Sequence, residues 1–194
     1  MASSPPLPRT GPRPGGRSAR VQEAVHRAVR ELAADHAREA LTVPMVAARA
    51  GVTPSTIYRR WGDLAELLAD VSVERMRPDG EPADTGALRG DLLAWAEQYN
   101  EEMSSQLGRA MLRDVLGAQS PDARPSCRCA DFIALQIGVL LARAQTRGEA
   151  APAVERVMDT LVAPLLFHLL FTAAPATGLQ IAGWVDASLA AAAP

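Results

Sequence analysis

Two short helices that meet at a glycine constrain this 194-residue chain more than any other feature of its sequence. Small apolar residues in segment 45–50 predict the first helix, and Gly51 follows where a chain leaving a helix commonly needs a left-handed backbone. Thr53 can then N-cap the second helix, and Pro54 suits a first turn in which no amide hydrogen is needed. Segment 41–61 is therefore predicted to form a helix-turn-helix.

The second of these helices has the side chains of a groove-reading helix. Ile57 and Trp61 lie four residues apart and are expected to face inward, which leaves the other positions exposed. The exposed side chains supply hydroxyl, phenol and guanidinium groups, which can donate to phosphates and base edges. The residues predicted to contact DNA are Arg17, Arg20, Thr42, Arg49, Thr53, Pro54, Ser55, Thr56, Tyr58, Arg59 and Arg60. For the turn alone, a compact helical hairpin with a solvated basic helix stays open as the alternative.

The neighbouring segments extend this unit in both directions. Apolar residues between Ser18 and Ala37 recur at three- and four-residue steps, which predicts a helix that supports the pair. Gly62 ends the second helix, and Asp63 with Glu66 three residues later is typical of the start of another helix. We therefore expect a three-helix unit that continues into a fourth helix.

Segment 20–76 resembles the N-terminal domain of the TetR/AcrR family of bacterial transcriptional regulators. The resemblance rests on Leu-Thr-Val at 41–43, Val-Ala-Ala-Arg-Ala-Gly-Val-Thr at 46–53 and Thr-Ile-Tyr-Arg-Arg-Trp at 56–61, in the order and spacing of the family. Pro54 and Leu64 stand where the family often has lysines. Because the chain contains no lysine, its phosphate contacts must come from its 20 basic residues, all arginines.

The charge is unevenly distributed, although the net charge is only −2. Residues 1–62 hold ten arginines and four acidic residues, a balance of +6, and the remainder carries −8. A basic head on an acidic body orients one end of a protein toward phosphate. Ordinary fluctuation of surface charge is the alternative.

The first 17 residues contain five prolines, three glycines and three arginines without apolar periodicity, which predicts a disordered arm. The residues that could enter an adjacent minor groove of DNA or lie along its phosphates are Arg9, Arg13, Arg17 and Arg20. The alternative is a leader that contacts nothing specific. The arm lacks the apolar core of a secretory signal, and no segment has the length of a membrane span. We therefore expect a cytoplasmic protein without a membrane partner.

The rest of the chain is also expected to be helical. Breaks at 117–125, 148–152 and 173–178 separate segments long enough to pack as a bundle, and no alternating strand pattern competes. The predicted fold is all-α: an N-terminal three-helix DNA-binding domain with a helix-turn-helix, then a C-terminal helical bundle for ligand binding and dimerisation. The expected domains are a basic arm at 1–17, a DNA-binding domain at 18–76 and a ligand-binding and dimerisation domain at 77–194.

The family resemblance implies two roles for the bundle. In TetR-like proteins the last two helices pair with those of a second subunit, and the candidates for that interface here are Leu166, Leu169, Leu170, Trp184 and Val185. That these helices only fill the core of one chain stays open, because they are apolar on more than one face. The resemblance also implies a cavity for a small molecule, whose candidate lining residues are Trp95, Tyr99, Met103, Met111, Phe132, Gln136, Met158 and Phe167.

Catalysis and metal binding find no support in the sequence. No catalytic or phosphate-binding motif occurs, so no catalytic residues, metal or cofactor are expected, and the chain is not expected to be an enzyme. Cys127 and Cys129 lie two residues apart without a nearby histidine; they are either incidental thiols or a redox-responsive pair.

Together these features predict a ligand-responsive homodimeric repressor. Its partners would be a palindromic double-stranded DNA operator, a second copy of the chain and a small-molecule effector. The alternatives are an activator, a regulator that needs a co-repressor, and a helical sensor module with a weakened DNA-binding head.

Overall fold

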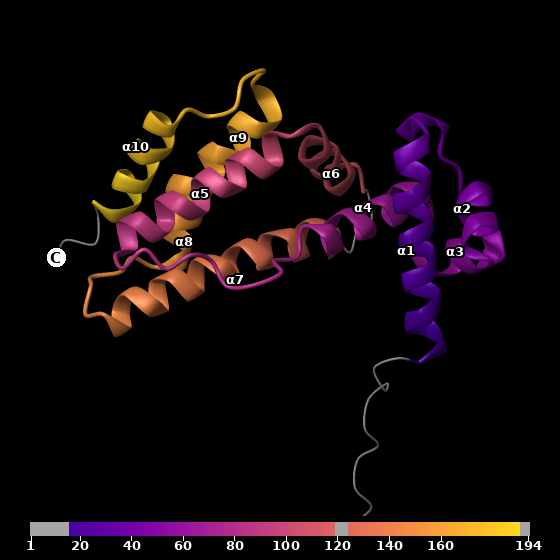
Figure 1. Ribbon diagram of the computed structural model, residues 1–194, viewed down its shortest axis with the longest axis horizontal. Coiled ribbons are helices and arrows are strands. Elements are labelled where there is room, and N and C mark those ends of the chain that lie inside the picture. Colours follow the sequence, from indigo (N-terminus) through magenta and orange to yellow (C-terminus); the bar gives the residue numbers. More distant parts are fainter. Residues whose placement is uncertain (1–15, 119–123, 191–194) are drawn as a thin grey trace, which may run out of the picture. The chain divides into compact units, whose positions relative to one another are not determined.

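The computed structural model describes residues 16–118 and 124–190, and all regular secondary structure in these ranges is helical (Figure 1). The predicted all-α fold class is therefore confirmed for the described ranges. The chain divides into two compact units, Met1–Leu67 and Leu68–Pro194. The predicted basic arm, with Arg9 and Arg13, lies almost entirely outside the described residues.

The first unit contains α1 (Arg17–Asp35), the short 3₁₀ turn η1 (Arg38–Ala40), α2 (Val43–Ala50), α3 (Pro54–Trp61) and the beginning of α4 (Leu64–Arg75). α2 packs against both α1 and α3. The apolar stripe predicted for α1 faces this packing, and its buried members are joined by side chains of the later helices. The buried apolar side chains of the unit are Val25, Ala28, Val29, Leu32, Leu41, Val43, Val46, Ala47, Ile57, Trp61 and Leu67.

The second unit is built around α5 (Leu88–Ser104), which lies between α7 (Arg124–Thr146) and the pair α9 (Ala163–Phe171) and α10 (Gly178–Leu189) (Figure 1). α6 (Gln106–Gly117) packs against α5, α7 and α9. The side chains that are almost completely buried in this unit include Leu92, Ile137, Leu140, Leu161, Leu165, Leu169 and Ile181.

α5 and α6 are separate helices, a division that the predicted breaks at 117–125, 148–152 and 173–178 do not include. Ser105 has an extended backbone and caps α6, because its hydroxyl accepts a hydrogen bond from Gly108 N at 2.9 Å. A Cβ at Gly108 would lie 2.3 Å from the carbonyl oxygen of Glu102. Only glycine therefore allows the two helices to approach this closely.

The helix that ends at Phe171 is not regular throughout. A short α8 (Val154–Val157) continues into a π-helical turn, η2 (Met158–Val162), before α9 begins. Pro164 stands at the start of α9 and has no amide hydrogen to complete an α-helical ladder across this point. The wider hydrogen-bond spacing of a π turn accommodates that missing donor without ending the helix.

Candidate functional site

The turn between α2 and α3 has the geometry that the sequence predicts. Thr42 caps α2, because its hydroxyl accepts a hydrogen bond from Met45 N at 3.4 Å. Gly51 has a φ of 68°, in the left-handed region, and Val52 N donates to Ala47 O at 3.0 Å. This bond closes the end of α2 and turns the chain into α3. The predicted helix-turn-helix is thus confirmed.

The start of α3 presents a group of exposed hydroxyls. Thr53 occupies the N-cap position as predicted, but its side chain makes no capping hydrogen bond. Its hydroxyl lies 2.9 Å from Ser55 Oγ and 3.0 Å from Thr56 Oγ1 instead. The three hydroxyls therefore form a local cluster beside Pro54, at a helix N-terminus whose backbone dipole favours an anion such as phosphate.

The two faces of α3 separate as the sequence predicts. Ile57 and Trp61 are buried, whereas Tyr58 and Arg59 are exposed. Arg59 has no hydrogen-bond or ion-pair partner among the described residues. The phenol of Tyr58 and the guanidinium of Arg59 are thus presented to solvent by a helix whose opposite face is fixed in the core.

Arg60 is used differently from Arg59. Its guanidinium donates to Ser18 O at 3.0 Å, to Ser18 Oγ at 2.8 Å and to Gln22 Oε1, and it lies 5.2 Å from the centre of the Trp61 ring. These contacts join α3 to the beginning of α1. Arg60 therefore fixes the orientation of α3, a role that the sequence pattern did not reveal.

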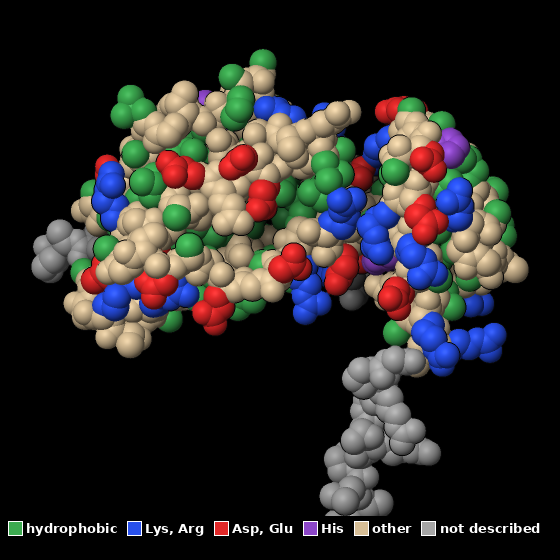
Figure 2. All heavy atoms as spheres, viewed as in Figure 1, with side chains coloured by type: hydrophobic (Ala, Val, Ile, Leu, Met, Phe, Trp, Pro, Cys, Tyr) green, Lys and Arg blue, Asp and Glu red, His purple; other side chains and the backbone are tan. Residues whose placement is uncertain are grey.

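Arg49 is also engaged within the chain, because it forms an ion pair with Glu31 of α1 at 3.1 Å. Arg17 and Arg20, at the beginning of α1, are exposed without a partner among the described residues. Figure 2 shows arginine side chains along the exposed surface of α1. The predicted DNA-contacting set therefore divides into unpaired side chains and side chains that hold the helices together.

The second unit encloses a cavity of about 500 Å³. Most of the predicted ligand-binding residues line it: Trp95, Tyr99, Met103, Met111, Phe132 and Gln136. Met158 and Phe167 do not, since Met158 packs against the main core and Phe167 is 58% exposed. The sequence pattern missed the end of α4 and the following segment 76–82, which also line the cavity.

The aromatic part of the cavity wall is held in a fixed arrangement. The rings of Trp95 and Tyr99 stack with centroids 5.3 Å apart and planes inclined by 17°. Trp95 Nε1 donates a hydrogen bond to Gln136 Oε1 at 2.8 Å, which joins α5 to α7. Tyr99 Oη is buried and has no hydrogen-bond partner, and burial is the largest cause of the raised pKa of this phenol.

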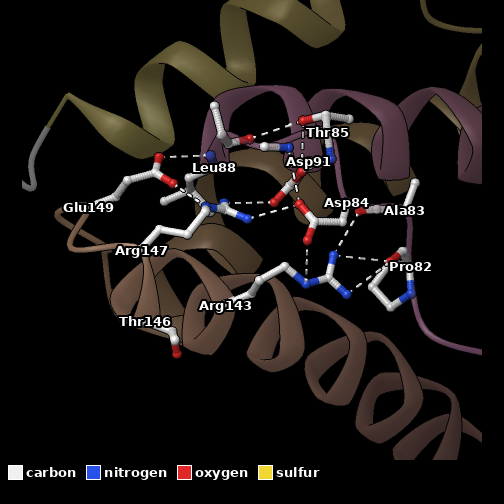
Figure 3. Close-up of polar contacts among 12 residues, drawn as sticks. Pro82, Ala83, Asp84, Thr85, Leu88, Asp91, Arg143, Thr146, Arg147 and Glu149 are labelled. Atoms are coloured by element: carbon white, nitrogen blue, oxygen red, sulfur yellow. Dashed lines mark hydrogen bonds and ion pairs between the residues drawn. The ribbon is translucent and has the colours of Figure 1, made fainter.

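A polar network holds the segment that follows the cavity wall (Figure 3). Arg143 Nη1 of α7 donates to Pro82 O at 3.2 Å and to Ala83 O at 3.0 Å. Arg147, one turn later, contacts Asp84 at 3.0 Å and Glu149 at 2.6 Å. The two arginines therefore fasten this segment along α7, and with it Pro82 at the edge of the cavity.

Asp91 is the buried member of this network, with a fully enclosed side chain. Its Oδ1 accepts from Thr85 N at 2.6 Å and from Thr85 Oγ1 at 2.7 Å, and its Oδ2 accepts from Arg147 at 2.9 Å (Figure 3). Burial alone would raise the pKa of this carboxyl group, but the hydrogen bonds from Thr85 and the ion pair with Arg147 outweigh it and lower the pKa.

Side chains of α6 and α7 hold the second half of α4. Arg128 forms ion pairs with Asp70 at 2.7 Å and with Glu74 at 3.1 Å. Ser72 Oγ donates to Asp114 Oδ2 of α6 at 2.9 Å, and both residues are buried. α4 is thus connected to two of the helices that line the cavity.

The candidate interface residues on α9 and α10 do not all lie on a surface. Leu169 and Val185 are 2% and 0% exposed and belong to the core of the chain itself. Leu166, Leu170 and Trp184 are partly buried against that core. The exposed apolar side chains nearby are Phe167, Phe171 and Leu179. Leu169 and Val185 are thereby corrected from interface to core positions, because their helices turn these side chains toward α5 and η2.

Of the two cysteines, the structure describes the side chain of Cys129, so the redox-responsive pair stays a prediction. Cys129 is partly buried, and burial raises the pKa of its thiol, which lowers its reactivity. The side chain of Cys127 lies outside the described part of the structure. Across residues 16–118 and 124–190, acidic, histidine and cysteine side chains form no group that could hold a metal. No helix in these ranges has the length and apolar character to span a membrane.

Both units match known protein families. Residues 27–71 match the family described as "Bacterial regulatory proteins, tetR family", and residues 82–188 match "Tetracyclin repressor-like, C-terminal domain". An uncharacterized HTH-type transcriptional regulator of Mycobacterium bovis is 31% identical over 156 residues, which cover 78% of this chain and 77% of that protein. The DNA-binding transcriptional repressor TetR of Mycobacteroides abscessus is 31% identical over 147 residues, or 73% and 77% of the two chains.

Solved structures show the same fold. The TetR family transcription regulator SCO0332 is 25% identical, with a TM-score of 0.61 over 90% of this chain and 99% of its own. The Thermus thermophilus repressor FadR, crystallised in complex with lauroyl-CoA, is 21% identical, with a TM-score of 0.53 over 88% of this chain and 92% of its own.

Proposed function

Because the chain belongs to the TetR family of transcriptional regulators, we propose that it is a cytoplasmic, ligand-responsive repressor that binds a palindromic operator as a homodimer. Regulation of transcription through DNA binding follows from the family. The operator contacts, the second subunit and the effector are the parts that we propose.

The observation that carries the proposal is the exposed face of α3. Tyr58 and Arg59 project from a helix whose Ile57 and Trp61 are buried, and three hydroxyls lie at its beginning. A helix of this kind fits the major groove, with its first turn toward base edges and its guanidinium groups near phosphates. Arg60 supports the contact indirectly, because it holds α3 against α1.

A dimer gives two such helices. We assign the second subunit to the exposed apolar surface of α9 and α10, formed by Phe167, Phe171 and Leu179. These side chains are 58%, 73% and 86% exposed, and the rings of Phe167 and Phe171 lie 5.2 Å apart, so they form an apolar patch that a symmetric copy would cover. Two recognition helices would then reach half-sites about 34–36 Å apart.

The cavity gives the effector its site. Its lining includes residues from the end of α4, and α4 also bonds to α6 and α7 through Ser72 and Arg128. A ligand that shifts α6 or α7 would therefore change the position of α4, which continues into the DNA-binding unit. Release of the operator requires only that the two heads no longer match their half-sites.

Substitutions on α3 test the DNA contact directly. On a duplex selected from random sequences by the unaltered chain, Tyr58→Phe and Arg59→Ala should each weaken binding by about 1–3 kcal/mol in a gel-shift titration. Arg113→Ala, an exposed arginine of α6, is the matched control, because it removes the same charge from the second unit. Variants that fold normally by circular dichroism and bind as tightly as the unaltered chain would contradict the proposed surface.

A further inference from the structure

We propose that the cavity binds a flat, uncharged, mainly apolar molecule whose acceptor oxygen takes a hydrogen bond from Tyr99. This inference rests on the proposed function, since it names the chemical class of the effector. Its basis is the buried Tyr99 hydroxyl, which has no hydrogen-bond partner, the amide nitrogen of Gln136, and the shape and charge of the cavity lining.

The hydroxyl of Tyr99 is the atom without a partner. It is buried and makes no hydrogen bond, and such a group costs about 1–3 kcal/mol if it stays unsatisfied. Two polarizable sulfur atoms lie in the cavity lining: the thiol of Cys129 is 4.0 Å from the thioether of Met76. Because methionine adapts its shape readily, a ligand atom can reach the phenol with little rearrangement.

The phenol keeps its proton, because burial raises its pKa and the nearby Cys129 and Glu102 raise it further. It is therefore available as a donor. The amide of Gln136 adds a second donor. Its oxygen accepts a hydrogen bond from Trp95 Nε1 at 2.8 Å, so its NH₂ group is not used in this bond. That nitrogen has no partner among the described residues and is not buried. Two unused donors favour an acceptor such as a carbonyl oxygen.

The aromatic side chains of the cavity lining favour a flat ligand. The stacked rings of Trp95 and Tyr99, 5.3 Å apart, present flat surfaces, and Phe132 adds a third ring to the lining. Aromatic pairs gain energy beyond area burial when rings lie at stacking or edge distances. Met103 and Met111 also line the cavity, and their sulfur atoms favour contact with ring systems.

The charged lining residues do not favour a charged ligand. Arg75, Arg77, Asp79, Glu81 and Glu102 line the cavity, and all five are exposed to solvent. The lining thus holds two guanidinium groups and three carboxylates, so neither sign of charge dominates. Because all five side chains are exposed, water solvates their charges and no oppositely charged ligand is needed.

Calorimetric titration of the full chain with naphthalene probes tests the chemical class. 2-Acetylnaphthalene has the proposed flat ring and carbonyl group, and 2-isopropenylnaphthalene has the same shape with a methylene in place of the oxygen. 2-Naphthoate carries a charge, and dodecanoate is a flexible chain. The ketone should bind tightest, and Tyr99→Phe should weaken the ketone about 3- to 10-fold while leaving the hydrocarbon unchanged.

Gln136→Glu is the second variant, because it keeps an acceptor for Trp95 and removes both amide donors; it should also weaken the ketone selectively. Tyr99→Phe should melt no lower than the unaltered chain, since the hydroxyl it removes has no partner. Equal affinity for ketone and hydrocarbon, an unchanged ketone affinity in Tyr99→Phe, or tighter binding of naphthoate or dodecanoate would overturn the proposal.

A gel shift with the selected duplex separates this inference from the function on which it rests. Ketone binding that leaves the chain on DNA supports the ligand class and overturns the role of the cavity as an effector site. DNA binding by a chain that binds none of the flat probes overturns the ligand class and leaves the DNA-binding regulator in place.

Discussion

Replacing Asp91 by asparagine tests what holds the edge of the cavity in place. The carboxylate is fully enclosed; its Oδ1 accepts two hydrogen bonds from Thr85, and its Oδ2 accepts one from Arg147 at 2.9 Å. Asparagine has nearly the same shape and keeps one acceptor for Thr85. Its amide nitrogen, however, would face the guanidinium of Arg147, donor against donor.

The expected cost follows from the bond that is lost. A hydrogen bond to a charged group contributes about 1.5–3 kcal/mol, so Asp91→Asn should destabilise the protein by about 2–3 kcal/mol. For a chain of this size the melting temperature changes by about 2–4 °C per kcal/mol, which gives a decrease of about 4–12 °C. Asp186→Asn is the matched control: Asp186 pairs with Arg89 at 2.7 Å on the surface, where ion pairs contribute little, so its melting temperature should change by less than about 2 °C.

The pH dependence distinguishes a charge effect from a packing effect. The pKa of Asp91 in the folded chain lies below its ordinary value of 3.8, so its stabilising contribution is present above that value and is lost as pH falls through the folded pKa. Differential scanning calorimetry should therefore find that Asp91→Asn melts below the unaltered chain by a constant amount from pH 7 to about pH 5. The difference in melting temperature should be smaller below pH 3.8. A melting-temperature difference that is absent at pH 7, or that grows in acid, would contradict a stabilising role for the Asp91 carboxylate.

Three further predictions concern the DNA contact, the dimer and α4. The logarithm of operator affinity should fall with the logarithm of salt concentration by about 0.9 per phosphate contact, and Arg59→Ala should make this slope shallower by about that amount per chain; an unchanged slope would place Arg59 away from phosphate. Phe171→Arg should convert a dimer to monomers in sedimentation experiments, whereas Leu116→Arg on α6 should not; a Phe171→Arg dimer would move the interface elsewhere. Arg128→Ala removes the ion pair with Asp70, so hydrogen exchange of α4 amides should accelerate; unchanged protection would show that the pair does not hold α4.

The helix-turn-helix could be predicted because its determinants are local in sequence. Gly51 and Gly62 have φ angles of 68° and 83°, and each follows directly on a helix, where positive φ is a property of glycine. The four-residue spacing of Ile57 and Trp61, with polar residues between them, likewise predicted which face of α3 is buried. Six of the eight candidate ligand-binding residues line the cavity, because the sequence analysis chose large apolar or aromatic side chains and one amide from α5, α6 and α7. That they bind a ligand stays a prediction.

The structural features that sequence analysis missed depend on contacts between residues far apart in the chain. Ser18 and Arg60 lie 42 residues apart, so no local pattern indicates the hydrogen bond by which Arg60 supports α3. The network of Asp91 and Arg147, 56 residues apart, is likewise invisible to periodicity. Leu169 and Val185 were misplaced because a helix that is apolar on several sides does not indicate which side faces its own core.

Binding of a palindromic operator by a homodimer can be tested by selecting sites from a random DNA pool with the full chain and then measuring the mass of the complex. We expect an enriched inverted repeat whose half-site centres lie about 34–36 Å apart along the duplex, bound by chains in pairs. A pool without any enriched sequence, or an enriched single site bound by one chain, would contradict a dimeric repressor that reads DNA with two copies of α3.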